Sequence, residues 1–403
     1  MKPMLAVLIL LMPATFMACG RSSTPESSAT AGRGGSPSSA AGSPKGELLW
    51  AFDFAASFSS NSPLALGETA GVVVFAAADS IHALDRKTGL RKWSSSLECP
   101  HCRWRTPSVG RSAVYIADGE FGVVMAFDLG SGRRLWQCPI PEGSNRGVAG
   151  RPVVVGDRVV VSTIDGRYCA IDAAAGTVLW NVPIDQRSSG GESAATPIIR
   201  DGKLLAGTWS GNVVAIDPAT GAHENRFFGG GTVSCQLLPT RAGLVFSVPG
   251  PPMERSRAAH GQLRCFDSSG KPVWSRAQTC SAIEAPPASD GDALYLTCEH
   301  PSVWLPDQQK FSNQTWMIHA IDGQTGRDLW AIPLRTGIRP SSPLIVAGRV
   351  LCVAANDTIY AFSKQDGSQI WAFGASHDVA GPLAWDGERL YAATERGRLY
   401  AIR

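Results

Sequence analysis

The chain contains 403 residues, of which 18% are charged, and its formal net charge is +3 at pH 7. The basic residues are scattered and form no lysine-rich run, so we do not expect nucleic acid as a partner. No helical periodicity stands out, and the 43 glycines and 27 prolines indicate many tight turns. Composition therefore favours a fold of short strands joined by turns.

The first 18 residues are predicted to be a cleaved signal peptide. An apolar run over residues 5–16 is too short to span a membrane and is followed by Ala18 and Cys19. This junction resembles the lipobox of bacterial lipoproteins, although Phe16 and Met17 replace the usual leucine and small residue. The resemblance implies that Cys19 is the lipidated first residue of the mature chain. The alternative is ordinary secretion with cleavage nearby.

Residues 19–45 are predicted to form a flexible linker after the lipidated cysteine. They are almost entirely Ser, Ala, Gly, Pro and Thr, a composition that cannot bury a hydrophobic core. We therefore expect a protein that is held at a membrane and faces out of the cytoplasm. Gly20 stands where an Asp would favour retention at the inner membrane. If the cell has two membranes, this favours the periplasmic face of the outer membrane.

Residues 46–403 repeat one phrase, Ala-x-Asp-x-x-Thr-Gly-x-x-x-Trp. The clearest copies contain Asp85, Gly89 and Trp93; Asp128, Gly132 and Trp136; Asp172, Gly176 and Trp180; and Asp322, Gly326 and Trp330. Weaker copies occur around Asp217, Asp267 and Gly367, and an eighth is split between residues 399–403 and the segment that ends at Trp50. Successive tryptophans from Trp50 to Trp180 lie 43, 43 and 44 residues apart, a period typical of a four-stranded propeller blade.

Each residue of the phrase has an expected structural role. The Asp is expected to accept hydrogen bonds from turn amides, the Gly to supply a positive φ, and the Trp to end the outermost strand. In the last unit, turns at Asp386-Gly387 and at residues 395–397 separate strands expected over 389–393 and 398–402. The sequence predicts an all-β, eight-bladed β-propeller over residues 46–403, with four antiparallel strands per blade. Pairing of the N- and C-terminal strands would close this monomeric ring. The alternative is a β-sandwich.

The cysteines fall into two groups. Cys169, Cys265, Cys298 and Cys352 lie in expected strands and are interpreted as core residues. A second group lies in expected connections between blades, where disulfides are plausible: Cys99, Cys102, Cys138, Cys235 and Cys280. Within it, Cys235 and Cys280 form one candidate pair and Cys99 and Cys102 another. Cys99-Pro-His-Cys102 is similar to the active-site sequence of thioredoxin-family oxidants, but no helix is expected there to activate a thiolate, which favours a local disulfide.

The sequence offers little evidence of a catalytic site. No serine-nucleophile elbow, zinc-protease motif or phosphate-binding glycine loop is present in the sequence. His82 and His319 occupy the same place in the repeat, and the repeated Asp occurs once per blade, so both are interpreted as structural. We therefore assign no catalytic, cofactor-binding or metal-binding residues.

A partner-binding surface is predicted on one rim. The connections between blades, and those between the second and third strands of a blade, emerge there, and the longest irregular insertions are residues 249–261 and 299–315. Arginine, aromatic and methionine residues, which are enriched in protein interfaces, provide candidate anchors: Arg103, Trp104, Arg105, Met253, Arg255, Arg257, Trp304 and Phe311. Alternatively, Trp304 and Phe311 only pin their own loop. A further hypothesis is an anionic glycan or small ligand at the channel mouth, bound by Arg105, Arg151, Arg187 and Arg339.

The repeated units resemble the quinoprotein (PQQ-like) β-propeller repeat, most clearly at residues 83–93, 170–180 and 320–330. One branch of this group contains PQQ-dependent dehydrogenases. Resemblance to that branch would imply a longer chain with adjacent cysteines, a calcium site and an active-site carboxylate. No two cysteines are adjacent in this sequence. A lipobox, a short tether and eight self-closing blades are more similar to the BamB outer-membrane assembly factor family. That resemblance implies a non-enzymatic envelope lipoprotein without cofactor that binds a protein partner, with a PQQ-dependent dehydrogenase as the alternative.

Overall fold

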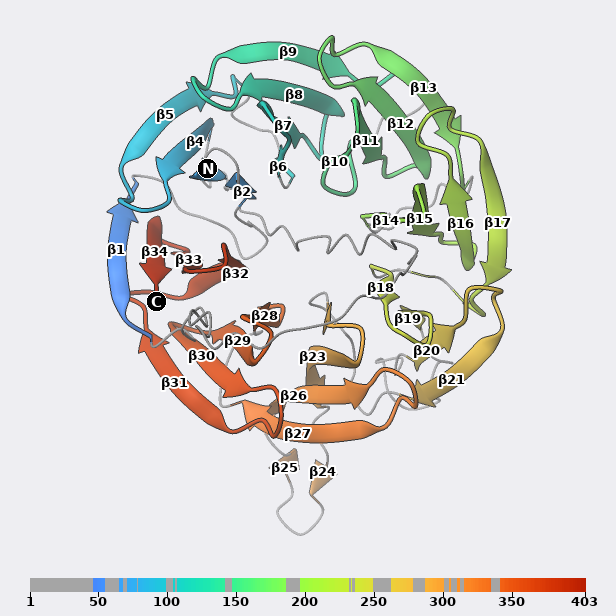
Figure 1. Ribbon diagram of the computed structural model, residues 1–403, viewed down its shortest axis with the longest axis vertical. Helices are drawn as coiled ribbons and strands as arrows, with labels where there is room; N and C mark the ends of the chain where they lie inside the picture. The colour runs from blue at the N-terminus through green and yellow to red at the C-terminus, as the bar shows by residue number, and fades with distance from the viewer. Residues whose placement is uncertain are drawn as a thin grey trace, which may run out of the picture.

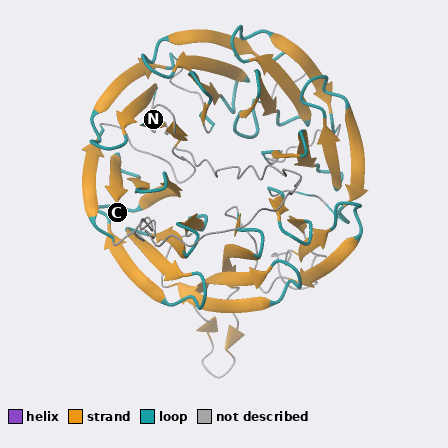
Figure 2. Ribbon diagram, in the orientation of Figure 1, coloured by secondary structure: helices purple, strands orange, loops and turns teal. Residues whose placement is uncertain are grey.

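The computed structural model is a ring of eight four-stranded antiparallel sheets, and no helix occurs among the described residues (Figures 1 and 2). The structure describes residues 46–54, 65–67, 71–77, 79–98, 104–105, 107–141, 147–185, 196–231, 233, 236–248, 262–277, 287–300, 304–305, 310–311, 315–334 and 341–403. In this part of the chain, no helix is long and apolar enough to cross a membrane. The predicted all-β, eight-bladed propeller is confirmed.

The first four blades follow one another in chain order, each from its inner to its outer strand. Blade one contains β2 (Ala65–Gly67), β3 (Val72–Ala77), β4 (Ser80–Asp85) and β5 (Arg91–Ser96). Blade two contains β6 (Ser108–Val109), β7 (Ala113–Ala117), β8 (Val123–Asp128) and β9 (Arg134–Pro139). Blade three contains β10 (Val153–Val155), β11 (Arg158–Ser162), β12 (Arg167–Asp172) and β13 (Val178–Pro183). Blade four contains β14 (Ile198–Arg200), β15 (Lys203–Gly207), β16 (Asn212–Ile216) and β17 (His223–Phe228).

The next three blades keep this order, with one insertion. Blade five contains β18 (Leu238–Pro239), β19 (Leu244–Val248), β20 (Gln262–Phe266) and β21 (Pro272–Ala277). Blade six contains β22 (Ala288–Ser289), β23 (Ala293–His300), β26 (Thr315–Asp322) and β27 (Asp328–Leu334). Blade seven contains β28 (Leu344–Val346), β29 (Val350–Ala355), β30 (Thr358–Ser363) and β31 (Gln369–Gly374).

The eighth blade joins the two ends of the described chain, as predicted. It contains β32 (Val379–Trp385), β33 (Leu390–Thr394), β34 (Arg398–Ile402) and, as its outer strand, β1 (Leu48–Asp53). Trp50 pairs with Ala401 in the antiparallel ladder between β1 and β34. Beyond it, Glu47 and Arg403 exchange two backbone hydrogen bonds of 2.9 and 2.7 Å. The ring is therefore sealed by hydrogen bonds between segments at opposite ends of the sequence.

The hydrophobic core is divided among the interfaces between neighbouring blades. In β3, Val72, Val74 and Ala76 pack with blade two, whereas Val73, Phe75 and Ala77 pack with blade eight. A hydrophobic cluster of this kind fills each of the eight interfaces. Because both faces of a middle strand are buried, its sequence is a continuous apolar run rather than an alternating one.

Every outer strand contains a β-bulge next to its aromatic residue. In β5, Trp93 pairs with Ala83 and Arg91 pairs with Leu84, so that Lys92 is skipped. The outer strands of the other seven blades shift register at the corresponding place. A bulge re-aims side chains, and here it leaves Arg91 and Lys92 both exposed while Trp93 turns into the core.

Blade six contains two additional short strands in the region that the sequence predicted to be an irregular insertion. Its strands β23 and β26 pair from Ala293↔Asp322 to His300↔Thr315. Beyond them, β24 (Trp304–Leu305) and β25 (Lys310–Phe311) form a separate two-stranded sheet. Figure 1 shows this pair outside the ring of blades, beyond β27. We call the pair of strands β24 and β25 the arm.

Candidate functional site

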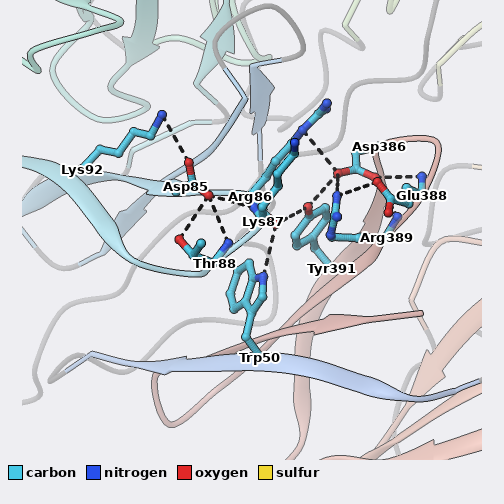
Figure 3. Close-up of polar contacts among 10 residues, drawn as sticks. All are labelled: Trp50, Asp85, Arg86, Lys87, Thr88, Lys92, Asp386, Glu388, Arg389 and Tyr391. Carbon is cyan, nitrogen blue, oxygen red and sulfur yellow. Dashed lines mark hydrogen bonds and ion pairs between the residues drawn. The ribbon is translucent and has the colours of Figure 1, made fainter.

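The repeated turn is organised around its aspartate. The Asp85 carboxylate accepts hydrogen bonds from the amides of Lys87 and Thr88, both at 3.0 Å, and from the Thr88 hydroxyl at 3.1 Å (Figure 3). Asp128, Asp172 and Asp322 accept equivalent amide bonds in their own turns. The Ser131 hydroxyl and amide bonds lower the pKa of Asp128 below its usual value. These aspartates are turn residues, as predicted.

The tryptophan of each repeat contacts the next blade. The Trp136 ring lies over Gly176, where a Cβ would be 2.6 Å from the ring, and the indole nitrogen donates to the Ala173 carbonyl at 3.1 Å. The same pair of contacts joins Trp50 to Gly89, Trp93 to Gly132, Trp180 to Gly221, Trp274 to Gly326 and Trp330 to Gly367. The sequence prediction gave these residues local roles and missed this contact. From Trp50 to Trp180 the glycine follows its tryptophan by 39 to 41 residues, and this nearly constant interval is the sequence signal that could have indicated the contact.

A polar cluster joins blade eight to blade one (Figure 3). The fully buried Asp386 carboxylate accepts a hydrogen bond from the Tyr391 hydroxyl at 2.7 Å and lies 3.7 Å from Arg86 and 3.6 Å from Arg389. The Tyr391 hydroxyl is also within 3.1 Å of the Arg86 carbonyl. Burial, together with the Asp386 charge, raises the pKa of Tyr391. Glu388 lies 3.0 Å from Arg389 and supplies a second carboxylate, so two arginines are matched by two acidic side chains where blades eight and one meet.

The candidate rim is only partly within the described chain. Trp104 is 2% exposed and packs in the cluster between blades one and two, and it forms a β-bridge with Asp118. Its ring is therefore not available at the surface, which corrects its assignment as a partner-binding anchor. Arg105 is half-buried, and its Nε donates to the Val148 carbonyl at 2.7 Å. The backbones of Trp304 and Phe311 face each other between β24 and β25.

Several predicted site residues lie outside the described residues, and their assignments remain predictions. They are Cys19, Cys99, Cys102, Arg103, Arg187, Cys235, Met253, Arg255, Arg257, Cys280 and Arg339.

Five cysteines lie within the described part of the chain, and all five are buried. Cys169, Cys265, Cys298 and Cys352 occupy strands of the core, as predicted. Cys138 was predicted in a connection between blades, but it belongs to β9, where it is free and likewise buried. Burial raises the pKa of the Cys138 thiol. A protonated, enclosed thiol is unreactive, so Cys138 is a core residue rather than a disulfide candidate.

The two repeat histidines differ in their surroundings. His82 stacks on Phe75, with ring centroids 5.0 Å apart, and burial together with the charge of Arg91 lowers its pKa to about 4. His319 instead places Nδ1 3.2 Å from Asp328, which is also bound by Arg276 at 2.7 Å. Over the described ranges, no group of three or more His, Cys, Asp or Glu side chains could hold a metal ion. His82 and His319 thus each contact a residue of their own blade.

The sequence matches the model of a known protein family. A family model described as "Outer membrane protein assembly factor BamB" matches residues 29–148, 103–226 and 259–403. The chain belongs to the BamB family. A curated member from Burkholderia pseudomallei, named "Outer membrane protein assembly factor BamB", is 27% identical over 363 residues, which cover 85% of this chain and 84% of that protein. The family resemblance that the sequence predicted is confirmed.

Two solved structures share the ring. BamB from Moraxella catarrhalis superposes with a TM-score of 0.62 at 17% identity, covering 88% of this chain and 98% of that chain. Quinohemoprotein alcohol dehydrogenase from Comamonas testosteroni gives a TM-score of 0.64 at 15% identity, covering 88% and 76%. At these identities the likeness concerns the fold alone, so the chemistry of the dehydrogenase does not transfer with it.

Proposed function

We propose that this protein is a non-enzymatic scaffold of outer-membrane protein assembly. It is tethered through a lipidated Cys19 to the periplasmic face of the outer membrane, and it binds protein partners without a cofactor. The observation that carries this proposal is the match of the BamB family model across the repeats. The relative from Burkholderia pseudomallei, which is aligned over 85% of the chain, supports it.

The binding surface that we propose is the rim with the insertions of blades five and six. In blades one, three, four, seven and eight the second and third strands are joined by short turns, such as Thr394 to Arg398 in blade eight. Blade five instead inserts residues 249–261, and blade six carries the arm with β24 and β25. On this rim, blades five and six thus differ from the other blades by their long connections. Arg255, Trp304 and Phe311 lie in these two insertions, which supports their role as contact residues.

Co-purification tests this surface. The chain is isolated from cross-linked envelopes as the wild type, as the double variant Arg255→Ala/Trp304→Ala, and as Phe121→Ala. Phe121 is a matched control because it is 62% exposed in the second-to-third strand connection of blade two. We expect the amount of outer-membrane assembly machinery that co-purifies with the double variant to fall at least about tenfold, since hot-spot anchors dominate interface affinity. The control should lose little. Equal recovery from all three proteins would refute the assignment.

A PQQ-dependent dehydrogenase is the second candidate, because the quinohemoprotein alcohol dehydrogenase shares the fold. We expect no alcohol- or sugar-dependent reduction of a redox dye when the purified chain is supplied with PQQ and calcium. Steady turnover in this assay would favour the dehydrogenase.

A further inference from the structure

The repeated turn of blade one, Asp85 to Lys92, differs in composition from its equivalents. Its sequence, Asp-Arg-Lys-Thr-Gly-Leu-Arg-Lys, contains four basic residues, whereas the corresponding segments of blades two to seven contain two or fewer. The residue after the glycine is Leu90, which is 69% exposed. At that place the other turns have Arg133, Thr177, Ala222, Lys271, Arg327 and Ser368. An exposed leucine flanked by cations therefore occurs in one turn of the series.

The geometry of the turn divides its cations into two kinds. Arg86 faces the seam and pairs with Asp386 (Figure 3). Lys87 and Arg91 are exposed, and neither has an ion-pair partner among the described side chains. Lys92 is exposed and lies 3.4 Å from Asp85. Because Asp85 fixes the turn through the Lys87 and Thr88 amides, the outward residues are displayed on a rigid frame.

The turn lies against the strand at which the linker ends. Trp50 of β1 covers Gly89, and its indole donates to the Arg86 carbonyl at 3.1 Å. On the same strand, Leu48 and Leu49 are 47% and 39% exposed. We call Lys87, Leu90, Arg91 and Lys92, together with Leu48 and Leu49, the tether-root patch. It combines exposed leucines with basic side chains immediately after residues 19–45, the predicted linker.

We propose that the tether-root patch binds anionic lipid headgroups of the membrane to which the chain is attached. Basic side chains close to an anionic leaflet each strengthen binding by about fivefold, and an exposed leucine can enter the interfacial region. The predicted linker of 27 residues would, as a flexible chain, have a root-mean-square span of about 30 Å and so would keep the patch near the lipid surface. This proposal rests on the membrane tethering in the proposed function. It adds a second membrane contact to the lipid anchor.

A lipid surface fits the patch better than an acidic protein segment does. Leu90 stands between Lys87 and Arg91 in the sequence of the turn and is exposed beside them, instead of lying in a separate apolar cleft. A bilayer interface offers phosphate groups and hydrocarbon in adjacent layers, which suits such interleaving. Binding to acidic polypeptide without binding to lipid is the competing outcome of the test.

Vesicle flotation tests the proposal with a chain that begins at Gly20, which carries no lipid and keeps every described strand. Vesicles contain phosphatidylglycerol and phosphatidylethanolamine in equal amounts, or phosphatidylcholine alone, at low salt. We expect binding to the anionic vesicles, reversed by salt, and little binding to phosphatidylcholine. Lys87→Glu/Arg91→Glu should weaken anionic binding at least about tenfold, and Leu90→Ser should weaken it severalfold.

The controls use equivalent exposed positions in other blades. Lys271→Glu/Arg327→Glu changes the net charge equally in the turns of blades five and six, and Leu329→Ser replaces a leucine that is 55% exposed. Both controls should bind as the wild type does, and matching thermal unfolding verifies the fold of all variants. Equal losses in controls and patch variants would overturn the proposal, as would binding to poly-glutamate but not to vesicles. Since the vesicles contain no protein, this result is independent of the co-purification test of the proposed function.

Discussion

The glycine of the repeated turn meets two separate requirements, one of its own backbone and one of the next blade. Gly176 has a φ of +72°, and a Cβ there would lie 2.6 Å from the Trp136 ring. Gly156, in another turn of blade three, has a φ of +60° but no heavy atom within 4 Å of a Cβ. Comparing Gly156 with Gly176 therefore distinguishes the cost of backbone strain from the cost of disturbing the contact between blades.

Replacing each of these glycines by alanine measures the two contributions. Gly156→Ala should cost about 1 kcal/mol, because a left-handed conformation is strained for an L-residue. Gly176→Ala should cost about 3–4 kcal/mol, because the methyl group also displaces the indole ring. Denaturant unfolding gives both values. Similar losses for the two variants would show that the tryptophan contact contributes nothing.

For single residues, the sequence predicts roles within a turn but not contacts between residues that are far apart in the chain. The Asp128 carboxylate and the positive φ of Gly132 act within one turn, so these two roles follow from residue type and spacing. The contact of Trp93 with the next blade depends on a partner more than 30 residues away, which turn chemistry does not reveal. Trp104, flanked by arginines, has the composition of an interface residue. Its burial depends on the packing of two blades, which no local pattern specifies.

Among the secondary-structure elements, β34 has the position on which closure depends, because it lies between β33 and β1. Leu399, Ala401 and Ile402 are fully buried on this strand. The sequence predicted this strand and its pairing, since both halves of a split repeat were recognisable at the two ends. It did not predict the arm with β24 and β25, because an insertion that occurs once has no second copy for comparison.

Removal of residues 399–403 tests the closure. The truncated chain loses most of β34 and leaves β1 without its partner, so we expect the unfolding midpoint to fall by more than about 10 °C. The variant Arg398→Ala, which keeps the strand and loses an ion pair with Asp53, should shift it by about 2 °C or less. Differential scanning calorimetry provides the measurement. An unchanged midpoint after truncation would mean that the ring does not depend on its terminal pairing.

The whole molecule combines a repetitive interior with a surface that differs from blade to blade. The eight interfaces use the same kinds of contact, which is why family and fold could be predicted from the repeat. The differences lie in the insertions of blades five and six and in the charged turn of blade one. A scaffold needs these differences, because a surface repeated identically eight times could not select one orientation for a partner.

The most direct test of the scaffold function is made in the source organism. The gene is deleted, and the amount of folded outer-membrane β-barrel protein is measured by heat-modifiable electrophoretic mobility, with the wild-type gene restored as the control. The proposed function predicts fewer folded β-barrel proteins in the deletion strain and recovery with the wild-type gene. Unchanged β-barrel proteins, together with the loss of a PQQ-dependent oxidation, would contradict it.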